Sequence, residues 1–145
     1  MKLKLAWIGK TKDRSIQTLT AEYTKRISRY IQIETQEFAS EAALLKSLEN
    51  AMPRPYFVAL DSRGKEMTSG EMSAYIGNHQ DRGTQMMVFG IGGPDGWSRQ
   101  ALDLAQMKLS MSKLTFPHEI ALVMLTEQIY RSFTILKNHP YHVGH

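Results

Sequence analysis

The sequence contains no cysteine. This absence excludes disulfide bridges and metal sites built from thiolates, and it fits a reducing compartment. No apolar run approaches the roughly 20 residues that a membrane-spanning helix needs. The apolar start of the chain is also too short for a signal peptide, because Lys10 and Lys12 interrupt it. We therefore expect a cytoplasmic protein with no membrane segment.

Acidic residues are scarce at the start of the chain. Residues 1–30 hold eight lysines and arginines against Asp13 and Glu22, whereas the whole chain has a net charge of +4. Such a segment favours a polyanionic partner such as nucleic acid, although a solvated basic face gives the same pattern. The 145 residues, 42% of them hydrophobic, fit one domain over residues 1–145.

Helical and alternating apolar patterns follow one another along the chain. Alternating or continuous apolar runs predict strands at 2–9, 31–38, 56–60, 85–91 and 108–112. Helical spacing and capping residues predict helices within 12–30, after Ser40, from Thr68 to about His79, from Ser98 to Leu104, and from Pro117 to about Leu136. A turn is expected at 62–65. The alternation predicts an α/β fold, with a mostly parallel sheet covered by helices on both faces.

In such a sheet, ligands bind beyond the carboxyl ends of the strands. The loops after Leu60, Ile91 and Ser110 fall there. The second of them, "FGIGGPDGW" at 89–97, contains four glycines. It is not a dinucleotide fingerprint, because Asp95 stands where the last glycine is required. Two interpretations remain: a plain turn, or a loop that brings backbone groups against a flat, phosphate-free ligand such as the adenosine of a methyl donor.

Histidines are poorly spaced for a metal. The stretch "HEIAL" at His118 begins like a zinc-protease helix, but Leu122 stands in place of the second histidine. His139, His142 and His145 recur every three residues at the end of the chain. We interpret them as a chance cluster and not as a metal site. We expect no metal site.

Three stretches carry a resemblance to a known family. They are "IGGPDG" at 91–96, "LSMSKLTFPHEIALVMLTEQIYRSFTI" at 109–135 and "NHPYH" at 138–142. In this order and spacing they resemble the RlmH family of ribosomal RNA methyltransferases, which belongs to the SPOUT superfamily. The resemblance implies a single SPOUT-type domain with a deep trefoil knot near the C-terminus and a tail at about 138–145. It also implies a homodimer that transfers a methyl group from S-adenosyl-L-methionine to N3 of a pseudouridine in 23S ribosomal RNA, with the site near the subunit interface.

The same resemblance assigns a donor pocket. Its members would be Leu60, Gly92, Met111, Ser112, Lys113, Leu114, Thr115 and Phe116. Pro117 biases the residue before it toward an extended backbone, which leaves peptide groups for an adenine edge. For the apolar members, packing in the core is the competing interpretation.

The tail supplies the remaining candidates. His142 stands at the place of the family's tail histidine and is the predicted general base for the imide proton; a mobile or RNA-contacting residue is the alternative. Tyr141 either stacks on a base or pins the tail to the protein. Arg131, with Tyr141, is a predicted RNA contact. The substrate should be looped or single-stranded RNA, because the pairing edge of a base is inaccessible in a duplex.

The chain departs from the family at its end, where Val143, Gly144 and His145 replace the usual basic residue. This departure leaves two further hypotheses beside the ribosomal RNA methyltransferase. One is a ribosome-binding or assembly module with a weakened catalytic site. The other is a related SPOUT enzyme acting on transfer RNA, against which the "NHPYH" ending argues.

Overall fold

The computed structural model describes residues 1–143, in which strands and helices alternate as the sequence predicts. The strands are β1 (Lys2–Ile8), β2 (Gln32–Phe38), β3 (Tyr56–Glu66), β4 (Met86–Ile91) and β5 (Met107–Ser110). The helices are α1 (Arg14–Ile27), α2 (Glu41–Asn50), α3 (Ser69–Asp81), α4 (Arg99–Leu104) and α5 (His118–Leu136). The last two residues of the predicted tail, Gly144 and His145, lie outside the described part.

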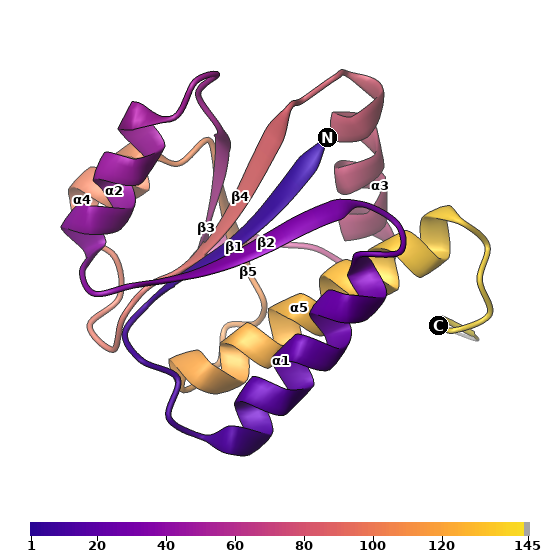
Figure 1. The fold of residues 1–145 in the computed structure, drawn as a ribbon, viewed down its shortest axis with the longest axis horizontal. Helices are drawn as coiled ribbons and strands as arrows, with labels where there is room; N and C mark the ends of the chain where they lie inside the picture. The colour runs from indigo at the N-terminus through magenta and orange to yellow at the C-terminus, as the bar shows by residue number, and fades with distance from the viewer. Residues whose placement is uncertain (144–145) are drawn as a thin grey trace.

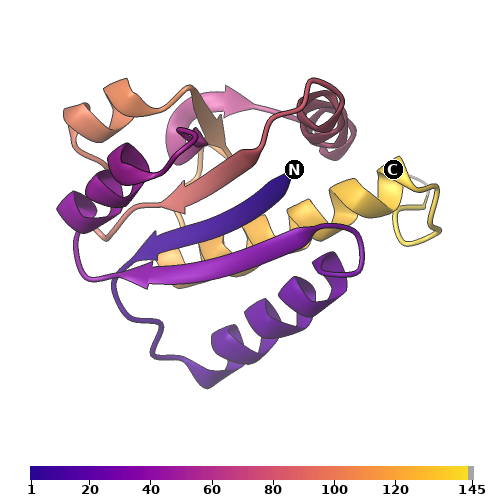
Figure 2. The same cartoon turned by 45° about the horizontal axis from the view of Figure 1, so that its top comes forward.

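The strands form one parallel sheet in the order β2-β1-β4-β3-β5. Helices α2 and α4 cover one face, and α1, α3 and α5 cover the other (Figures 1 and 2). The predicted α/β class, with a parallel sheet between two helical layers, is confirmed.

Both faces of the central strands are buried, which explains their continuous apolar sequence. Side chains alternate between the faces along a strand. Met87 and Phe89 of β4 therefore pack against the layer that contains α5, whereas Val88 packs against the layer that contains α2. On β3, Phe57 and Val58 divide between the two layers in the same way.

Capping residues fix where the helices begin. Ser40 accepts a hydrogen bond from the backbone N–H of Ala43, Ser98 accepts one from Ala101, and Thr68 forms a capping box with Glu71, as predicted. Each such cap stabilises its helix by about 1 kcal/mol. Pro117 is the N-cap residue of α5, one position before the predicted first turn, and it provides no side-chain cap.

The predicted turn at 62–65 is wrong. Strand β3 continues to Glu66, and Leu109 of β5 pairs with both Leu60 and Lys65, so that residues 61–64 form a bulge. At Gly64 the backbone presses against β5: an added Cβ would lie 2.5 Å from the Lys108 carbonyl oxygen. A glycine followed by lysine is typical of a turn, but here it permits close contact between two strands.

We expect Gly64→Ala to destabilise the fold, because the new methyl group collides with backbone that cannot rotate away. The loss should be at least about 2 kcal/mol in the free energy of unfolding, measured in urea. Gly70→Ala is the matched control. Its nearest contact would be the Thr68 hydroxyl at 3.9 Å, so that helix propensity should leave stability equal or up to ~1 kcal/mol higher. Equal stability of the two variants would contradict the close approach.

Candidate active site

The loops after β3, β4 and β5 meet at one edge of the sheet and enclose a cavity. These strands are neighbours in the sheet and run parallel, so their carboxyl ends lie together. The cavity has a volume of about 610 Å³, and its lining comes from the segments 60–63, 91–97, 111–112 and 114–118 with Ala121 of α5. The predicted convergence of the three loops is confirmed.

Trp97 joins two of the loops. Its indole Nε1 donates a hydrogen bond of 2.9 Å to the Leu60 carbonyl oxygen, and its ring meets Phe57 edge to face. An added Cβ at Gly92 would lie 3.2 Å from the Trp97 ring, and Gly96 adopts φ +74°. The glycine segment is therefore a turn folded around its own tryptophan, and it also lines the cavity. The turn interpretation of "FGIGGPDGW" is confirmed, and contact of its backbone with a ligand stays a prediction.

Serine hydroxyls shape the third loop. Ser110, which is buried, donates to the carbonyl oxygens of Ser62 and Ser112 at 3.1 and 2.9 Å. Ser112 in turn accepts a hydrogen bond of 3.0 Å from the backbone N–H of Leu114. These contacts tie the loop to the bulge of β3 and hold its backbone beside the cavity.

Seven of the predicted donor-pocket residues line this cavity: Leu60, Gly92, Met111, Ser112, Leu114, Thr115 and Phe116. Lys113 does not. Its side chain is exposed and its Nζ lies 4.0 Å from a carboxylate oxygen of Glu66. Leu114 is 70% exposed, so core packing does not explain it. Leu60 and Met111 contact both the cavity and the core.

The cavity is also lined by residues that were not predicted to belong to the donor pocket. Asp61 accepts a hydrogen bond from the backbone N–H of Arg63, and both line the wall. Asp61 could have been noticed, since it directly follows a buried strand. The Nε2 atom of His118 is buried without a hydrogen-bond partner among residues 1–143. Only its place at the start of α5 could have indicated a site role.

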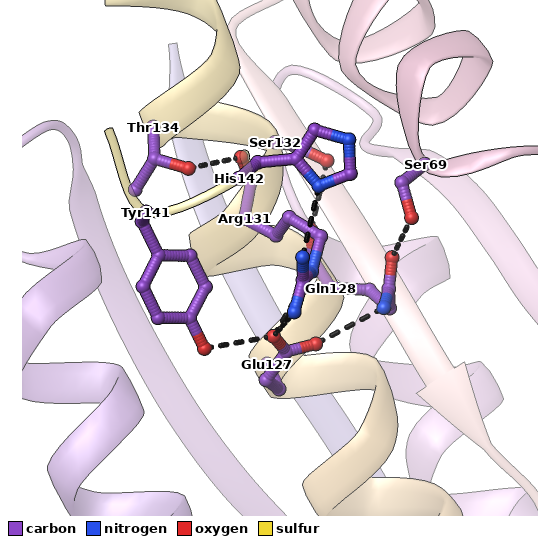
Figure 3. Close-up of polar contacts among 8 residues, drawn as sticks. All are labelled: Ser69, Glu127, Gln128, Arg131, Ser132, Thr134, Tyr141 and His142. Carbon is purple, nitrogen blue, oxygen red and sulfur yellow. Dashed lines mark hydrogen bonds and ion pairs between the residues drawn. The ribbon is translucent and has the colours of Figure 1, made fainter. Parts of the chain in front are cut away.

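A second polar group lies at the other end of α5 and contains the predicted tail residues (Figure 3). Glu127 Oε1 accepts hydrogen bonds from Arg131 Nε and Nη2 at 3.1 and 2.7 Å, and from the Tyr141 hydroxyl at 2.9 Å. Arg131 Nη1 lies 2.9 Å from Nδ1 of His142. We call Glu127, Arg131, Tyr141 and His142 the tail cluster. Glu127 was not predicted, although its i,i+4 spacing to Arg131 is the usual one for a helical ion pair.

The surroundings of the tail cluster keep its donors protonated. The hydrogen bond to Glu127 raises the pKa of Arg131. Burial raises the pKa of Tyr141 above its ordinary value, and hydrogen bonds to Tyr23 and Glu127 raise it further. The Tyr141 ring packs edge-on against Tyr130 and lies 5.0 Å from the Arg131 guanidinium carbon. Tyr141 therefore pins the tail to the protein, one of its two predicted roles.

The cavity and the contact between Arg131 and His142 lie at different positions along α5. Ala121 is the last residue of α5 that lines the cavity, and Arg131 lies ten residues further along the helix, which corresponds to about 15 Å. Within one chain, the structure does not bring His142 to the predicted donor pocket.

The link between Trp97 and Leu60 should contribute to stability. Trp97→Phe keeps most of the ring but leaves the Leu60 carbonyl without its donor, so we expect a loss of about 1–2 kcal/mol in urea unfolding. Trp7→Phe is the control: the Trp7 indole makes an exposed contact of 3.4 Å to Glu37, and its loss should cost less than about 0.5 kcal/mol. Comparable losses in both variants would contradict the bridging role of Trp97.

No helix within residues 1–143 combines the length and apolar character needed to cross a membrane. In the same part of the chain, histidine and acidic side chains form no group of three that could hold a metal ion.

Two solved structures of other proteins resemble this fold. The SpoU methyltransferase AviRb from Streptomyces viridochromogenes, in complex with AdoMet, has a TM-score of 0.55 and 12% identity. The match covers 90% of this chain and 57% of AviRb, so this chain spans little more than half the length of that protein. A probable methylase family protein from Haemophilus influenzae has a TM-score of 0.59 and 7% identity, with 98% and 70% of the two chains covered.

Sequence comparison places the chain in a family. Residues 1–142 match the family described as "Predicted SPOUT methyltransferase". The "Ribosomal RNA large subunit methyltransferase H" of Koribacter versatilis is 51% identical over all of both chains. The protein of the same name from Trichlorobacter lovleyi is 40% identical, with 98% of this chain and 99% of that one covered. The chain therefore belongs to the RlmH family of SPOUT methyltransferases, as the resemblance of its motifs predicted.

Proposed function

We propose that the protein transfers a methyl group from S-adenosyl-L-methionine to N3 of a pseudouridine in large-subunit ribosomal RNA. The observation that carries the proposal is the cavity of about 610 Å³, which seven predicted donor residues from three separate loops surround. Full-length identity of 51% to a protein named for ribosomal RNA methylation supports the substrate class. A homodimer, a cytoplasmic location and the knot that the family implies are parts of the same proposal.

The residues of the cavity fit the donor. Its volume falls in the range of small-molecule sites, about 300–1,000 Å³, and its walls combine apolar side chains with backbone polar groups. Leu60, Leu114 and Phe116 would hold the flat adenine, while the backbone of the third loop would bind its polar edge. The Asp61 carboxylate could accept hydrogen bonds from ribose hydroxyls. When bound, S-adenosyl-L-methionine supplies an electrophilic methyl group.

The chain's own contribution to the reaction is placement. The glycine turn and the third loop would hold the methyl donor in a fixed orientation for the transfer. Basic residues near this end would contact RNA phosphates: Lys10 and Lys12 lie in the loop before α1, and the Lys12 backbone N–H donates to Glu119 of α5 at 2.8 Å. That hydrogen bond holds the basic loop beside the cavity.

Distance supports a dimer in which each subunit completes the site of the other. Because His142 does not line the cavity and its partner Arg131 lies about 15 Å along α5 from Ala121, a second copy would have to bring its tail cluster to the cavity. Exposed apolar side chains suited to such an interface lie on α1 and α5: Leu19 and Ile120, with exposures of 44% and 42%.

Transfer of a tritiated methyl group to ribosomes from a strain that lacks the enzyme tests the function. We expect label in large-subunit RNA, and nucleoside mapping should place it on N3 of a pseudouridine. Binding of the donor without transfer would contradict the proposal and favour the ribosome-binding module. Labelling of transfer RNA in preference to ribosomal RNA would contradict the substrate assignment.

Two adjacent residues test the donor pocket. Leu114→Ala should weaken binding of S-adenosyl-L-methionine about 5- to 10-fold in calorimetry, because an apolar contact with the ligand is lost. Lys113→Ala should leave the affinity unchanged, since Lys113 lies outside the cavity wall. Both side chains are exposed, so neither change should affect folding. Equal effects would show that the cavity does not hold the donor.

A further inference from the structure

The contact between Arg131 and His142 fixes which nitrogen of the imidazole carries a proton. Arg131 Nη1 lies 2.9 Å from Nδ1 of His142. A guanidinium has only N–H donors and stays protonated in proteins, so Arg131 donates and Nδ1 accepts. A neutral imidazole that accepts at Nδ1 carries its hydrogen at Nε2. His142 is therefore held as the Nε2–H tautomer.

Glu127 holds the guanidinium in the direction that this contact needs. Its Oε1 atom accepts from Nε and Nη2 of Arg131, which leaves Nη1 directed at the imidazole (Figure 3). The other carboxylate oxygen accepts from Gln128, whose own carbonyl oxygen accepts from Ser69 of α3 at 2.7 Å. The Arg131 and Glu127 side chains are only 22% and 17% exposed. Glu127 therefore holds the Arg131 guanidinium on one side, and His142 contacts it on the other.

Within residues 1–143, other charged and titratable groups near the cluster make contacts of their own. From α1, Tyr23 packs against Tyr130, and Arg26 pairs with Glu22. From the tail, Tyr141 donates to Glu127, and its backbone N–H donates to His139 Nδ1. A hydrogen on His142 Nδ1 would instead point at an N–H of Arg131. The arrangement thus favours one tautomer.

We propose that His142 serves the methyl transfer as a hydrogen-bond donor through Nε2, with Arg131 and Glu127 as positioning residues, and not as the general base that its residue type suggests. The inference rests on the proposed function. The imide N3 of a pseudouridine lies between two carbonyl groups, and donation to one of these oxygens stabilises the negative charge that develops as N3 loses its proton.

The atoms of the step balance without a protein base. The N3–H bond breaks and the proton passes to solvent water. The electron pair left on N3 forms the new N–C bond, while the C–S bond breaks and its electrons stay on sulfur. His142 keeps its Nε2 hydrogen throughout and only shares it with the carbonyl oxygen.

Nuclear magnetic resonance of protein labelled with ¹⁵N-histidine measures the tautomer directly. The protein has five histidines, and the signal missing from His142→Gln identifies the one of interest. We expect a neutral ring protonated at Nε2 at about pH 7.5, and a mixture of tautomers in Arg131→Met and Glu127→Gln. A ring protonated at Nδ1 in the unchanged protein would overturn the proposal. This measurement needs no RNA, so it stands even if the proposed function fails.

Methylation of ribosomes by two variants tests the role. Glutamine carries an amide N–H near the place of Nε2 but cannot take up a proton, so His142→Gln should stay within about 10-fold of the normal rate. His142→Leu, which has no donor, should lose about 100-fold or more. Urea unfolding of both checks that they fold. Equal loss in the two folded variants would overturn the donor role.

The pH dependence of kcat/KM also distinguishes a histidine that acts as a general base from one that acts as a hydrogen-bond donor. With a histidine base of ordinary pKa, about 6.5, kcat/KM should level off above about pH 7. With a donor, kcat/KM should continue to rise into the alkaline range as more of the imide ionises. A plateau near neutral pH that disappears in His142→Gln would contradict the proposal.

Discussion

Packing of α5 against the sheet fixes the positions of the cavity and of the tail cluster relative to each other. Leu122, Leu125, Ile129 and Phe133 on one side of this helix are almost completely buried, and each stabilises the fold by about 1.5–3 kcal/mol. The same helix borders the cavity at its first turn and carries Glu127 at its middle and Arg131 in its second half. Because a packed helix of this length is rigid, its two ends cannot approach each other. The distance between the cavity and the tail cluster is therefore a fixed property of one chain.

Local sequence was sufficient to predict most of the fold. Strand β4 is a continuous apolar run because both of its faces are buried, and Ser40, Thr68 and Ser98 begin helices through their own hydroxyls. The bulge of β3 could not be predicted in this way. Gly64 looks like a turn residue, and only the nearby backbone of Lys108 explains it. A contact between residues so distant in sequence leaves no local pattern.

The candidate site, too, could be predicted only in part from local sequence. Loops at the carboxyl ends of parallel strands could be predicted to meet, and seven of the eight residues predicted for the donor pocket line one cavity there. The direction of each side chain could not be predicted. Lys113, for example, points to Glu66, although its neighbours face the cavity. The chemistry of His142 also depends on a tertiary contact, since residue type alone suggests a base while the Arg131 guanidinium requires an accepting Nδ1.

We propose that two subunits share each active site. Mixing two inactive variants tests this proposal most directly. Thr115→Trp would fill the donor cavity, and His142→Leu would remove the tail donor; each homodimer should be inactive. After subunit exchange, half of the dimers are mixed and hold one complete site, so roughly a quarter of normal methyl transfer should return. If the mixture forms dimers but stays inactive, each chain must complete its own site, and the account is wrong.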